Sequence, residues 1–381
     1  MQLIGKFKKK LFIILALCFY TSICFPSGNE KLIRIAILDN FNFQPNITNQ
    51  YDKYYLAGIE AAVFAAKEKK IKIEYKIFRY SRDALAILKI VPDVNSWQPD
   101  VIIGPRNSNM FLTIRNSFKN ILVISPYASS SAVEYMPKNY YSLSLPDKYM
   151  AQAISIFLKK NHPTNGLISI VEADCKNCVD ISHELSSIYH NNYPKNNFNE
   201  NFFLQKSVKE LDIEKTLNGY KKDDVIFLPN TSYASTILMV RITNYLARPM
   251  FFLGADDWGS WRNSEVGKLK ANYPYYGIRV TSWSLDSDYK LKEEFLKNFK
   301  KLHHGMPEDA VSMLAYATIG SIVSALNKYP EPMVSDIKTE ILNSYMHALK
   351  NDKNWFRQSE YKFYKTDSTG DVLIDTIKLP L

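Results

Sequence analysis

The sequence contains little cysteine and little glycine. Its 381 residues include four Cys and 13 Gly. So few cysteines exclude a small domain held together by many disulfides, and so little glycine excludes a collagen-like repeat. The remaining composition, 46% hydrophobic and 23% charged, is that of an ordinary globular protein. At roughly 100–200 residues per domain, the length predicts two lobes of about 150 residues each.

Long apolar runs are absent after the first 28 residues, where no stretch reaches the roughly 18 residues of a membrane-spanning helix. The first 28 residues differ, because lysines between positions 6 and 10 precede the uncharged apolar run Leu11–Phe25. This order and length are typical of a secretory signal peptide. We therefore expect residues 1–28 to hold a cleaved signal, with a cut after Cys24 favoured over one at Gly28. The mature protein is expected to be periplasmic or secreted.

The two cysteines of the signal region raise the question of a lipid anchor. An acylated cysteine should follow a small residue, whereas Cys18 follows Leu17 and Cys24 follows Ile23. We therefore expect no lipid anchor, and contact with a membrane only through a partner.

Acidic residues are fewer than basic ones, with 38 Asp+Glu against 48 Lys+Arg and a formal net charge of +10. The signal region holds four of these lysines, so cleavage leaves 44 Lys+Arg against 38 Asp+Glu, a net charge of +6. The remaining excess lies in short lysine runs typical of solvated helix faces. A nucleic-acid partner is therefore not expected.

Short apolar runs alternate with amphipathic stretches along the mature chain. The buried run 33–38 is followed by 54–67, where apolar residues recur at helical spacing. Repeated strand–helix alternation predicts the α/β class, and its restart after Pro146 predicts two doubly wound parallel-sheet lobes. The asparagine-rich stretch 191–201 is expected to be a surface loop. The expected strands are 33–38, 71–78, 100–104, 121–124, 166–171, 224–229, 250–254 and 276–282, with strand-like runs in 361–378; the expected helices are 54–67, 82–90, 110–118, 148–159, 179–189, 235–246, 289–302 and 311–326.

Polar residues follow three of the expected strands at their carboxyl ends, where open parallel sheets bind ligands. Ser129 and Ser130 precede a helix start, where hydroxyls and free N–H groups suit an anionic group such as a carboxylate. Ser131 and Glu134 have the spacing of a capping box, so a structural role is an equal alternative for Ser131. The three loops are 104–108, 125–131 and 254–257.

The segments DVIIGPRNS at 100–108 and ILVISPYASSS at 121–131 resemble the type I periplasmic binding proteins of the leucine/isoleucine/valine-binding family. These are the substrate-binding components of ABC importers. The resemblance covers most of the mature chain, through IRIAIL, YYLAGIEAAVFAA, YSLSLPDKYMAQAI, FFLGADDWG and EDAVSMLAYATIGSIVSAL. It implies two doubly wound lobes that are joined by three crossovers and close on a ligand like a hinge. The implied parts are a signal peptide at 1–28, an N-terminal lobe of 29–145 plus 278–354, and a C-terminal lobe of 146–277 plus 355–381.

The resemblance also implies ligand-binding residues in the first lobe. Ser108 matches a hydroxyl residue that binds the ligand carboxylate. The loop residues Tyr127, Ala128 and Ser129 match a Ser-Pro-x-Ala-Thr loop, in which a backbone N–H and a hydroxyl hold the same carboxylate. Arg106 would favour a more acidic ligand if it points into the cleft, and a solvated loop arginine is the alternative.

In the second lobe, Asp256 falls where the family places an acid that pairs with the ligand's ammonium group, and Asp257 is the alternative. Neighbouring side chains on an extended segment point apart, so only one of the two is expected to face the cleft. A helix cap or a surface turn is the structural alternative. The chain departs from the family at Glu172–Cys178, where relatives commonly carry Tyr-Gly. Asp174 is the candidate ligand residue there, and the departure puts an aliphatic amino-acid ligand in doubt.

Cys175 and Cys178 are the two cysteines that remain after cleavage. In an exported protein they are expected to form an intrachain disulfide. A redox pair is an alternative, because helix N-termini lower thiol pKa values, but the Trp that precedes the first cysteine in thioredoxins is missing. A metal site is not expected, since the six histidines offer no second ligand pair with convincing spacing.

Recognised enzyme motifs are missing, including Gly-x-Gly-x-x-Gly, the phosphate-binding Gly-x-x-x-x-Gly-Lys-Ser/Thr, Gly-x-Ser-x-Gly and His-Glu-x-x-His. We therefore expect a non-catalytic, monomeric binding protein without a cofactor. It would capture a small polar solute, such as an amino acid or amide, and deliver it to an ABC permease. An envelope sensor with the same fold, and a thiol oxidoreductase using Cys175 and Cys178, are the alternatives.

Overall fold

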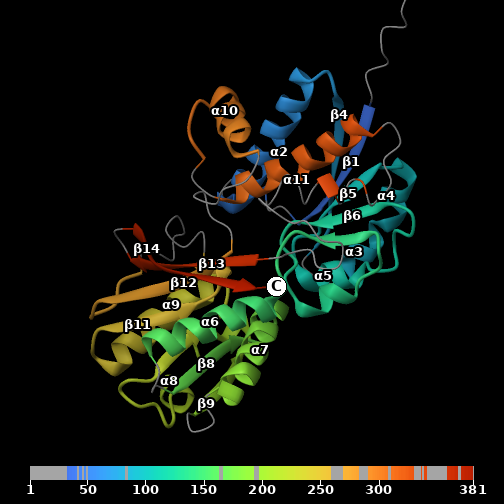
Figure 1. Cartoon of the computed structure of the whole chain (residues 1–381). Helices are drawn as coiled ribbons and strands as arrows, with labels where there is room; N and C mark the ends of the chain where they lie inside the picture. Colours follow the sequence, from blue (N-terminus) through green and yellow to red (C-terminus); the bar gives the residue numbers. More distant parts are fainter. Residues whose placement is uncertain are drawn as a thin grey trace, which may run out of the picture.

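The computed structural model contains two α/β lobes (Figure 1). The expected signal peptide lies outside the described residues. Within the part of the chain that the structure describes, no helix has the length and apolar character needed to cross a bilayer. The described residues are 32–40, 43–44, 47–48, 50–81, 85–162, 166–192, 197–258, 269–282, 291–307, 310–329, 336, 339–340, 358–367 and 370–380.

The first lobe is built on a five-stranded parallel sheet with the order β4-β1-β5-β6-β7. Its central strand β5 is short and fully apolar because helices cover both faces, and Val101, Ile102 and Ile103 are all buried. The strands are β1 (Leu32–Asp39), β4 (Lys72–Arg79), β5 (Val101–Ile103), β6 (Leu122–Ser125) and β7 (Tyr140–Ser142); a separate two-stranded ribbon joins β2 (Phe43–Gln44) and β3 (Ile47–Thr48).

Alternate residues of β1 face two different helical layers. Ile35 and Ile37 pack with α2 (Gln50–Glu68), α10 (Lys292–His303) and α11 (Ala310–Lys328). Ala36 and Leu38 pack with α3 (Ala86–Lys89), α4 (Val91–Trp97) and α5 (Ser108–Thr113) on the other face. Helices α2 and α11 approach closely at Gly58, where a Cβ atom would lie 2.1 Å from the carbonyl oxygen of Ser312. The first lobe therefore depends on helices from two distant parts of the chain.

The second lobe is built on a seven-stranded sheet with the order β14-β13-β12-β11-β10-β8-β9. Its first five strands along the chain are parallel, and the last two are antiparallel and form a hairpin. The strands are β8 (Leu167–Glu172), β9 (Phe198–Phe203), β10 (Val225–Leu228), β11 (Met250–Gly254), β12 (Tyr275–Thr281), β13 (Gln358–Asp367) and β14 (Gly370–Pro380).

Helices cover both faces of this sheet as well. On one face α6 (Asp147–Asn161) and α7 (Lys176–Asn192) pack on the sheet, and the Phe157 ring of α6 stacks on the Phe363 ring of β13 at 4.3 Å. On the other face lie α8 (Ile213–Thr216) and α9 (Ser232–Leu246). Three short 3-10 helices are η1 (Ser131–Tyr135), η2 (Gln205–Ser207) and η3 (Asp256–Trp258). The two-lobed, doubly wound α/β class predicted from the sequence is confirmed.

The chain passes between the lobes three times, from β7 to α6, from β12 to α10 and from α11 to β13 (Figure 1). The strand β12 belongs to the second sheet and runs past residue 278, where the sequence places a lobe boundary. The exact residue bounds of the lobes remain a prediction.

Several details differ from the sequence-based expectation. The helix expected at 82–90 is followed by a second one, α4, because Pro92 near its start fits the first turn of a new helix. The stretch 191–201 is only in part a loop, since β9 adds an edge strand to the sheet. The capping box at Ser131 does not form. Ser130 caps η1 instead, accepting the Ala132 N–H at 3.3 Å.

Candidate functional site

The carboxyl ends of β5 and β6 bring two of the predicted loops together. Gly104 allows this approach, because its φ is 95° and a Cβ atom there would lie 2.3 Å from the carbonyl oxygen of Leu38. The buried Ser108 hydroxyl accepts the backbone N–H groups of Ser129 at 3.1 Å and Ser130 at 3.2 Å. The predicted carboxylate-binding hydroxyl therefore lies at the predicted loop.

Ser129 and Ala128 of the 125–131 loop have different roles. The Ser129 side chain is nearly buried, and among the described residues its hydroxyl has no hydrogen-bond partner. The backbone of Ala128 is already engaged, since its N–H donates to the Ser125 hydroxyl at 3.0 Å and its carbonyl accepts from Ser142 at 2.5 Å. Ser129 is thus a group that can meet a ligand, and Ala128 holds the loop in shape. Tyr127 lies half-buried, its ring 6.2 Å from that of Tyr55.

Arg106 is neither a solvated loop residue nor a free cation in the cleft. Its guanidinium pairs with Asp39 at 2.6 Å and with Asp52 at 2.6 Å, and lies over the Tyr55 ring at 5.0 Å from the ring centre. Asp39 ends β1 and is only 1% exposed. Burial raises the pKa of Asp39 from 3.8 to about 6, although Arg106 opposes the rise. Two carboxylates therefore offset one arginine, and Arg106 adds no net positive charge to the site.

The acidic turn of the second lobe is held by a tryptophan. The Trp258 ring fills space left by Gly254 and Gly277, where added Cβ atoms would lie 2.2 and 2.4 Å from ring atoms. The buried Trp258 Nε1 donates to the Leu228 carbonyl at 3.1 Å and to the Ser235 hydroxyl at 2.9 Å. This packing fixes η3, at whose start Asp256 lies half-buried. The side chain of Asp257 lies outside the description.

Asp256 shares its surroundings with two residues of the lobe boundary. Tyr361 on β13 is fully buried, and its hydroxyl has no hydrogen-bond partner among the described residues. Burial raises the Tyr361 pKa well above its usual value, and the carboxylates of Asp256 and Asp147 raise it further. Asp147 begins α6, and its N–H donates to the Ser129 carbonyl at 2.7 Å. Asp147 therefore lies between the Ser129 loop and the Asp256 turn.

Asp174, the third predicted acid, has a local structural role. It lies on the exposed turn after β8, and its carboxylate accepts the N–H of Gln205 at 3.0 Å. Behind that turn the buried Glu172 accepts from the Thr231 hydroxyl at 2.8 Å, and Asn230 accepts the Glu172 N–H at 2.6 Å. These bonds join the carboxyl ends of β8 and β10.

Cys175 and Cys178 are joined by a disulfide, with their Cα atoms 5.2 Å apart. Cys178 is fully buried and Cys175 is 9% exposed. A thiol oxidoreductase needs a sulfur atom that its substrate can reach, and this buried pair offers little access. Among the described residues, no three His, Cys, Asp or Glu side chains are arranged to hold a metal ion.

The lobes touch directly through η1 and α7. The Ser130 hydroxyl donates to the Asp180 carboxylate at 2.5 Å, and Lys176 pairs with the same carboxylate. One turn of η1 further on, Glu134 pairs with Lys148 of α6 at 2.5 Å. A cavity of about 310 Å³ beside this contact is lined by Ser131, Ala132, Lys176, Asp180, His183 and Glu184.

Comparison with known proteins identifies the architecture. No family model matches the chain, and no curated protein matches it in sequence. A leucine-binding protein from Thermotoga maritima superimposes with a TM-score of 0.72 at 14% identity, over 91% of this chain and 98% of that one. A branched-chain amino acid transporter substrate-binding protein from Streptococcus pneumoniae, in complex with isoleucine, gives 0.70 at 12%, over 92% and 100%. An ABC transporter solute-binding protein from R. palustris, in complex with benzoate, gives 0.70 at 11%, over 92% and 97%.

This chain has the type I periplasmic binding protein fold. The resemblance seen in the sequence is therefore confirmed for the architecture. In a type I periplasmic binding protein fold the carboxyl ends of both parallel sheets face the boundary between the lobes. The Ser108, Ser129 and Asp256 loops follow those strand ends, which is where a ligand of this fold would lie.

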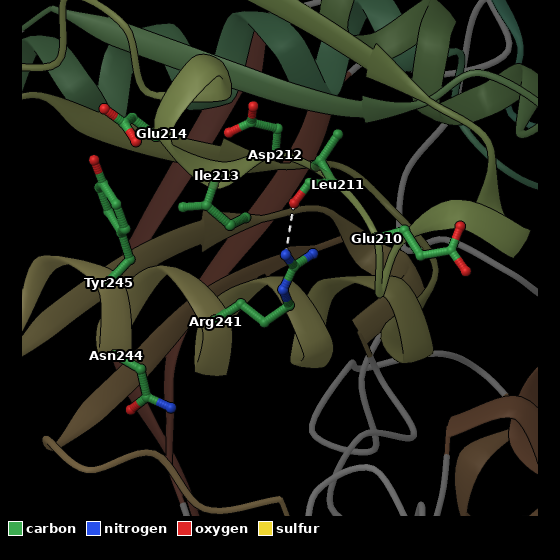
Figure 2. A pocket seen from close by; sticks show the side chains of 8 residues that line it. All are labelled: Glu210, Leu211, Asp212, Ile213, Glu214, Arg241, Asn244 and Tyr245. Atoms are coloured by element: carbon green, nitrogen blue, oxygen red, sulfur yellow. Dashed lines mark hydrogen bonds between the residues drawn. The ribbon is translucent and has the colours of Figure 1, made fainter.

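A larger pocket of about 560 Å³ lies elsewhere in the type I fold, on the second lobe (Figure 2). Tyr245 and Asn244 line it at the end of α9, which begins at the carboxyl edge of the sheet and so ends at the opposite edge. Arg241 partly fills it and donates to the carbonyls of Val208 at 2.7 Å and Leu211 at 2.6 Å. This pocket does not contain any of the predicted ligand residues.

The sequence did not indicate three residues of the lobe boundary. They are Asp39 and Asp52, which hold Arg106, and Asp180, which joins the lobes through Ser130. An acid at the end of a strand is a usable signal for Asp39, because such positions line the cleft in open parallel sheets. The partners Ser130 and Asp180 are 50 residues apart, and no local pattern links them.

Proposed function

We propose that the protein is an extracytoplasmic, non-catalytic binding protein that captures a small carboxylate-bearing solute between its lobes for an ABC importer. The observation that carries the proposal is the pair of converging loops in the first lobe. The Ser129 hydroxyl lacks a partner among the described residues, and the N–H groups of Ser129 and Ser130 point at the Ser108 hydroxyl. Because the Ser108 hydroxyl accepts these N–H groups, it keeps its own proton to donate, and the hydroxyls of Ser108 and Ser129 suit a carboxylate.

The solutes bound by proteins of similar structure support this chemistry. Two are described in complex with leucine or isoleucine, one with benzoate, and one is a fatty acid substrate-binding protein. All of these solutes carry a carboxylate. These solutes are consistent with separate roles for the two lobes. Ser129 of the first lobe would bind the carboxylate, and Asp256 of the second lobe would determine which carboxylate-bearing solute is accepted.

Asp256 favours an amino acid or related compound among the possible carboxylates. Asp256 and Asp147 both act on the Tyr361 hydroxyl at the boundary, so the second lobe presents negative charge there. This charge would attract the ammonium group of an amino acid and repel a simple carboxylate. Arg106 does not reverse the preference, because Asp39 and Asp52 already neutralise it.

The test starts with a thermal-shift screen of the mature chain, using amino acids, amides, short peptides, sugars and simple carboxylates. A ligand that binds only the folded state raises the midpoint of unfolding. We expect a hit among compounds with both a carboxylate and an ammonium group. A hit confined to sugars or to carboxylates without an ammonium group would refute the proposed ligand class.

Isothermal titration with the hit then tests the residues. Ser129→Ala should weaken binding by about tenfold, the usual effect of one lost hydrogen bond, and Asp256→Ala by at least as much. Ser131→Ala is the matched control, because it removes a hydroxyl two residues away from Ser129. Unchanged affinity in both Ser129→Ala and Asp256→Ala would remove the proposed site. A permease gene beside the gene for this chain would favour transport, and its absence would favour a sensing role.

A further inference from the structure

The contact between Ser130 and Asp180 joins the two lobes at the edge of the candidate ligand site. Ser130 ends the loop that follows β6 in the first lobe, and Asp180 lies in the second turn of α7 in the second lobe. Both positions follow carboxyl ends of parallel strands, so they face each other across the boundary where the lobes meet. Their side chains lie 2.5 Å apart, from the Ser130 hydroxyl oxygen to a carboxylate oxygen of Asp180.

Each partner is held in position from its own lobe. Ser130 is completely buried, its N–H donates to the Ser108 hydroxyl, and its side-chain oxygen accepts the N–H of Ala132. A hydroxyl has one proton to donate, and in Ser130 that proton points to Asp180. On α7, Lys176 pairs with Asp180 one helical turn away, which fixes the carboxylate on the face that meets the first lobe.

The same residue therefore touches the ligand site with its backbone and the opposite lobe with its side chain. Ser108, which accepts the Ser130 N–H, is the hydroxyl residue proposed to meet a ligand carboxylate. The bond from Ser130 to Asp180 therefore links this residue of the ligand site to the second lobe, and it exists only while the lobes are together. The link is charge-assisted and part-buried, and a charge-assisted hydrogen bond is stronger than one between neutral groups.

We propose that Asp180 is a positioning residue, which holds the lobes closed through Ser130 without touching the ligand. The inference rests on the proposed function only in treating closure as the step that encloses a solute. It requires that the protein occupies the closed arrangement to a measurable extent before any solute binds. A second pair, Glu134 and Lys148, also joins the lobes beside the first crossover, but an ion pair with both side chains about a third exposed contributes little to stability.

The experiment measures lobe separation in the absence of ligand. Spin labels are placed on the mature chain through Lys67→Cys in α2 and Lys209→Cys beside η2, which are exposed positions in different lobes. Double electron–electron resonance then gives the populations of short and long label distances. Asp180→Ala and Ser130→Ala should each raise the open-to-closed ratio by about tenfold. The double variant should change it no further than either single one, since both remove the same bond.

Glu184→Gln is the matched control, because Glu184 lies one turn further along α7 and lines the same small cavity. It also removes one negative charge but has no bond to Ser130. An unchanged distance distribution in Asp180→Ala and Ser130→Ala would overturn the proposal, as would an equal change in Glu184→Gln. If Asp180→Ala fails to fold, Ser130→Ala decides alone, since it removes one oxygen atom from the contact.

No ligand takes part in this measurement, so its outcome separates the two proposals. A protein that opens on Asp180→Ala but binds none of the screened solutes would support the closing contact and refute the proposed ligand class. If the protein instead binds an amino acid through Ser129 and Asp256, and Asp180→Ala does not change closure, the ligand class is supported and the closing contact is refuted.

Discussion

Replacing Arg106 with methionine should destabilise the first lobe strongly at alkaline pH and much less at acidic pH. Arg106 pairs with Asp39 and Asp52, and Asp39 is 1% exposed. The substitution leaves that carboxylate buried without its cation. Removing one partner of a buried ion pair costs about 3–5 kcal/mol in the free energy of unfolding. At pH 8 we expect a loss in this range.

The pH dependence follows from the pKa of Asp39, which rises from 3.8 to about 6 on folding. At 1.36 kcal/mol per pH unit, that rise is worth about 3 kcal/mol. Between those two values the folded protein binds a proton that the unfolded chain releases. The contribution of Asp39 to the free energy of unfolding is therefore fully present below about pH 4 and is lost as the pH rises through 6. Arg106 lowers the Asp39 pKa, so Arg106→Met raises it further, and at pH 5 Asp39 is largely protonated in both proteins.

Urea denaturation of the mature wild type and of Arg106→Met, at constant ionic strength, measures the loss in free energy of unfolding at pH 8 and at pH 5. We expect the loss at pH 5 to be less than half of the loss at pH 8. Arg115→Met is the control, because Arg115 is exposed and has no ion pair among the described residues. Equal losses at the two pH values, or a loss below about 1 kcal/mol at pH 8, would refute the reasoning about the buried carboxylate.

Two further predictions concern the framework. Gly58→Ala should lower the free energy of unfolding by about 1–3 kcal/mol, because its new methyl group would lie 2.1 Å from the Ser312 carbonyl oxygen and push α2 from α11. Thermal unfolding of this variant and of a control, Gly305→Ala, checks the prediction. At Gly305 an added Cβ atom would lie 3.9 Å from the nearest atom, and equal midpoints of unfolding in the two variants would contradict the prediction. Replacing Cys175 and Cys178 together with alanine should cost about 2 kcal/mol in urea denaturation, because the disulfide closes a short loop. Lost ligand binding at unchanged stability would instead point to a functional thiol pair.

The sequence predicts most of the architecture because local patterns encode it. The run 33–38 and the helical spacing in 54–67 became β1 and α2 within a few residues, since apolar periodicity reports burial directly. The three-residue strand β7 has too few residues to show a period. The edge strand β9 was missed because its Asn199 and Asn201 are residue types that strands generally avoid, and its outer side faces solvent.

The candidate site was predictable only where it follows strand ends. The proximity of Ser108 to Ser129 was predictable because polar residues after buried strands gather at one edge of a parallel sheet. The ion pair of Arg106 with Asp39 could not be predicted. The two residues lie 67 positions apart, and nothing in the sequence distinguishes Asp39 from the other acidic residues as the partner. The helix cap moved from Ser131 to Ser130 because the chain forms a 3-10 turn there, to which capping-box spacing does not apply.

The threefold passage between lobes also determines when each lobe can finish folding during synthesis. The first lobe lacks one side of its core until α10 and α11 emerge, up to residue 328, and the second sheet lacks its hairpin until residue 380. Neither lobe can therefore complete its core as an independent unit while the ribosome is still making the first three quarters of the chain. A polypeptide of this design therefore keeps part of its apolar core exposed for most of its synthesis, which is the state in which chains are prone to aggregate.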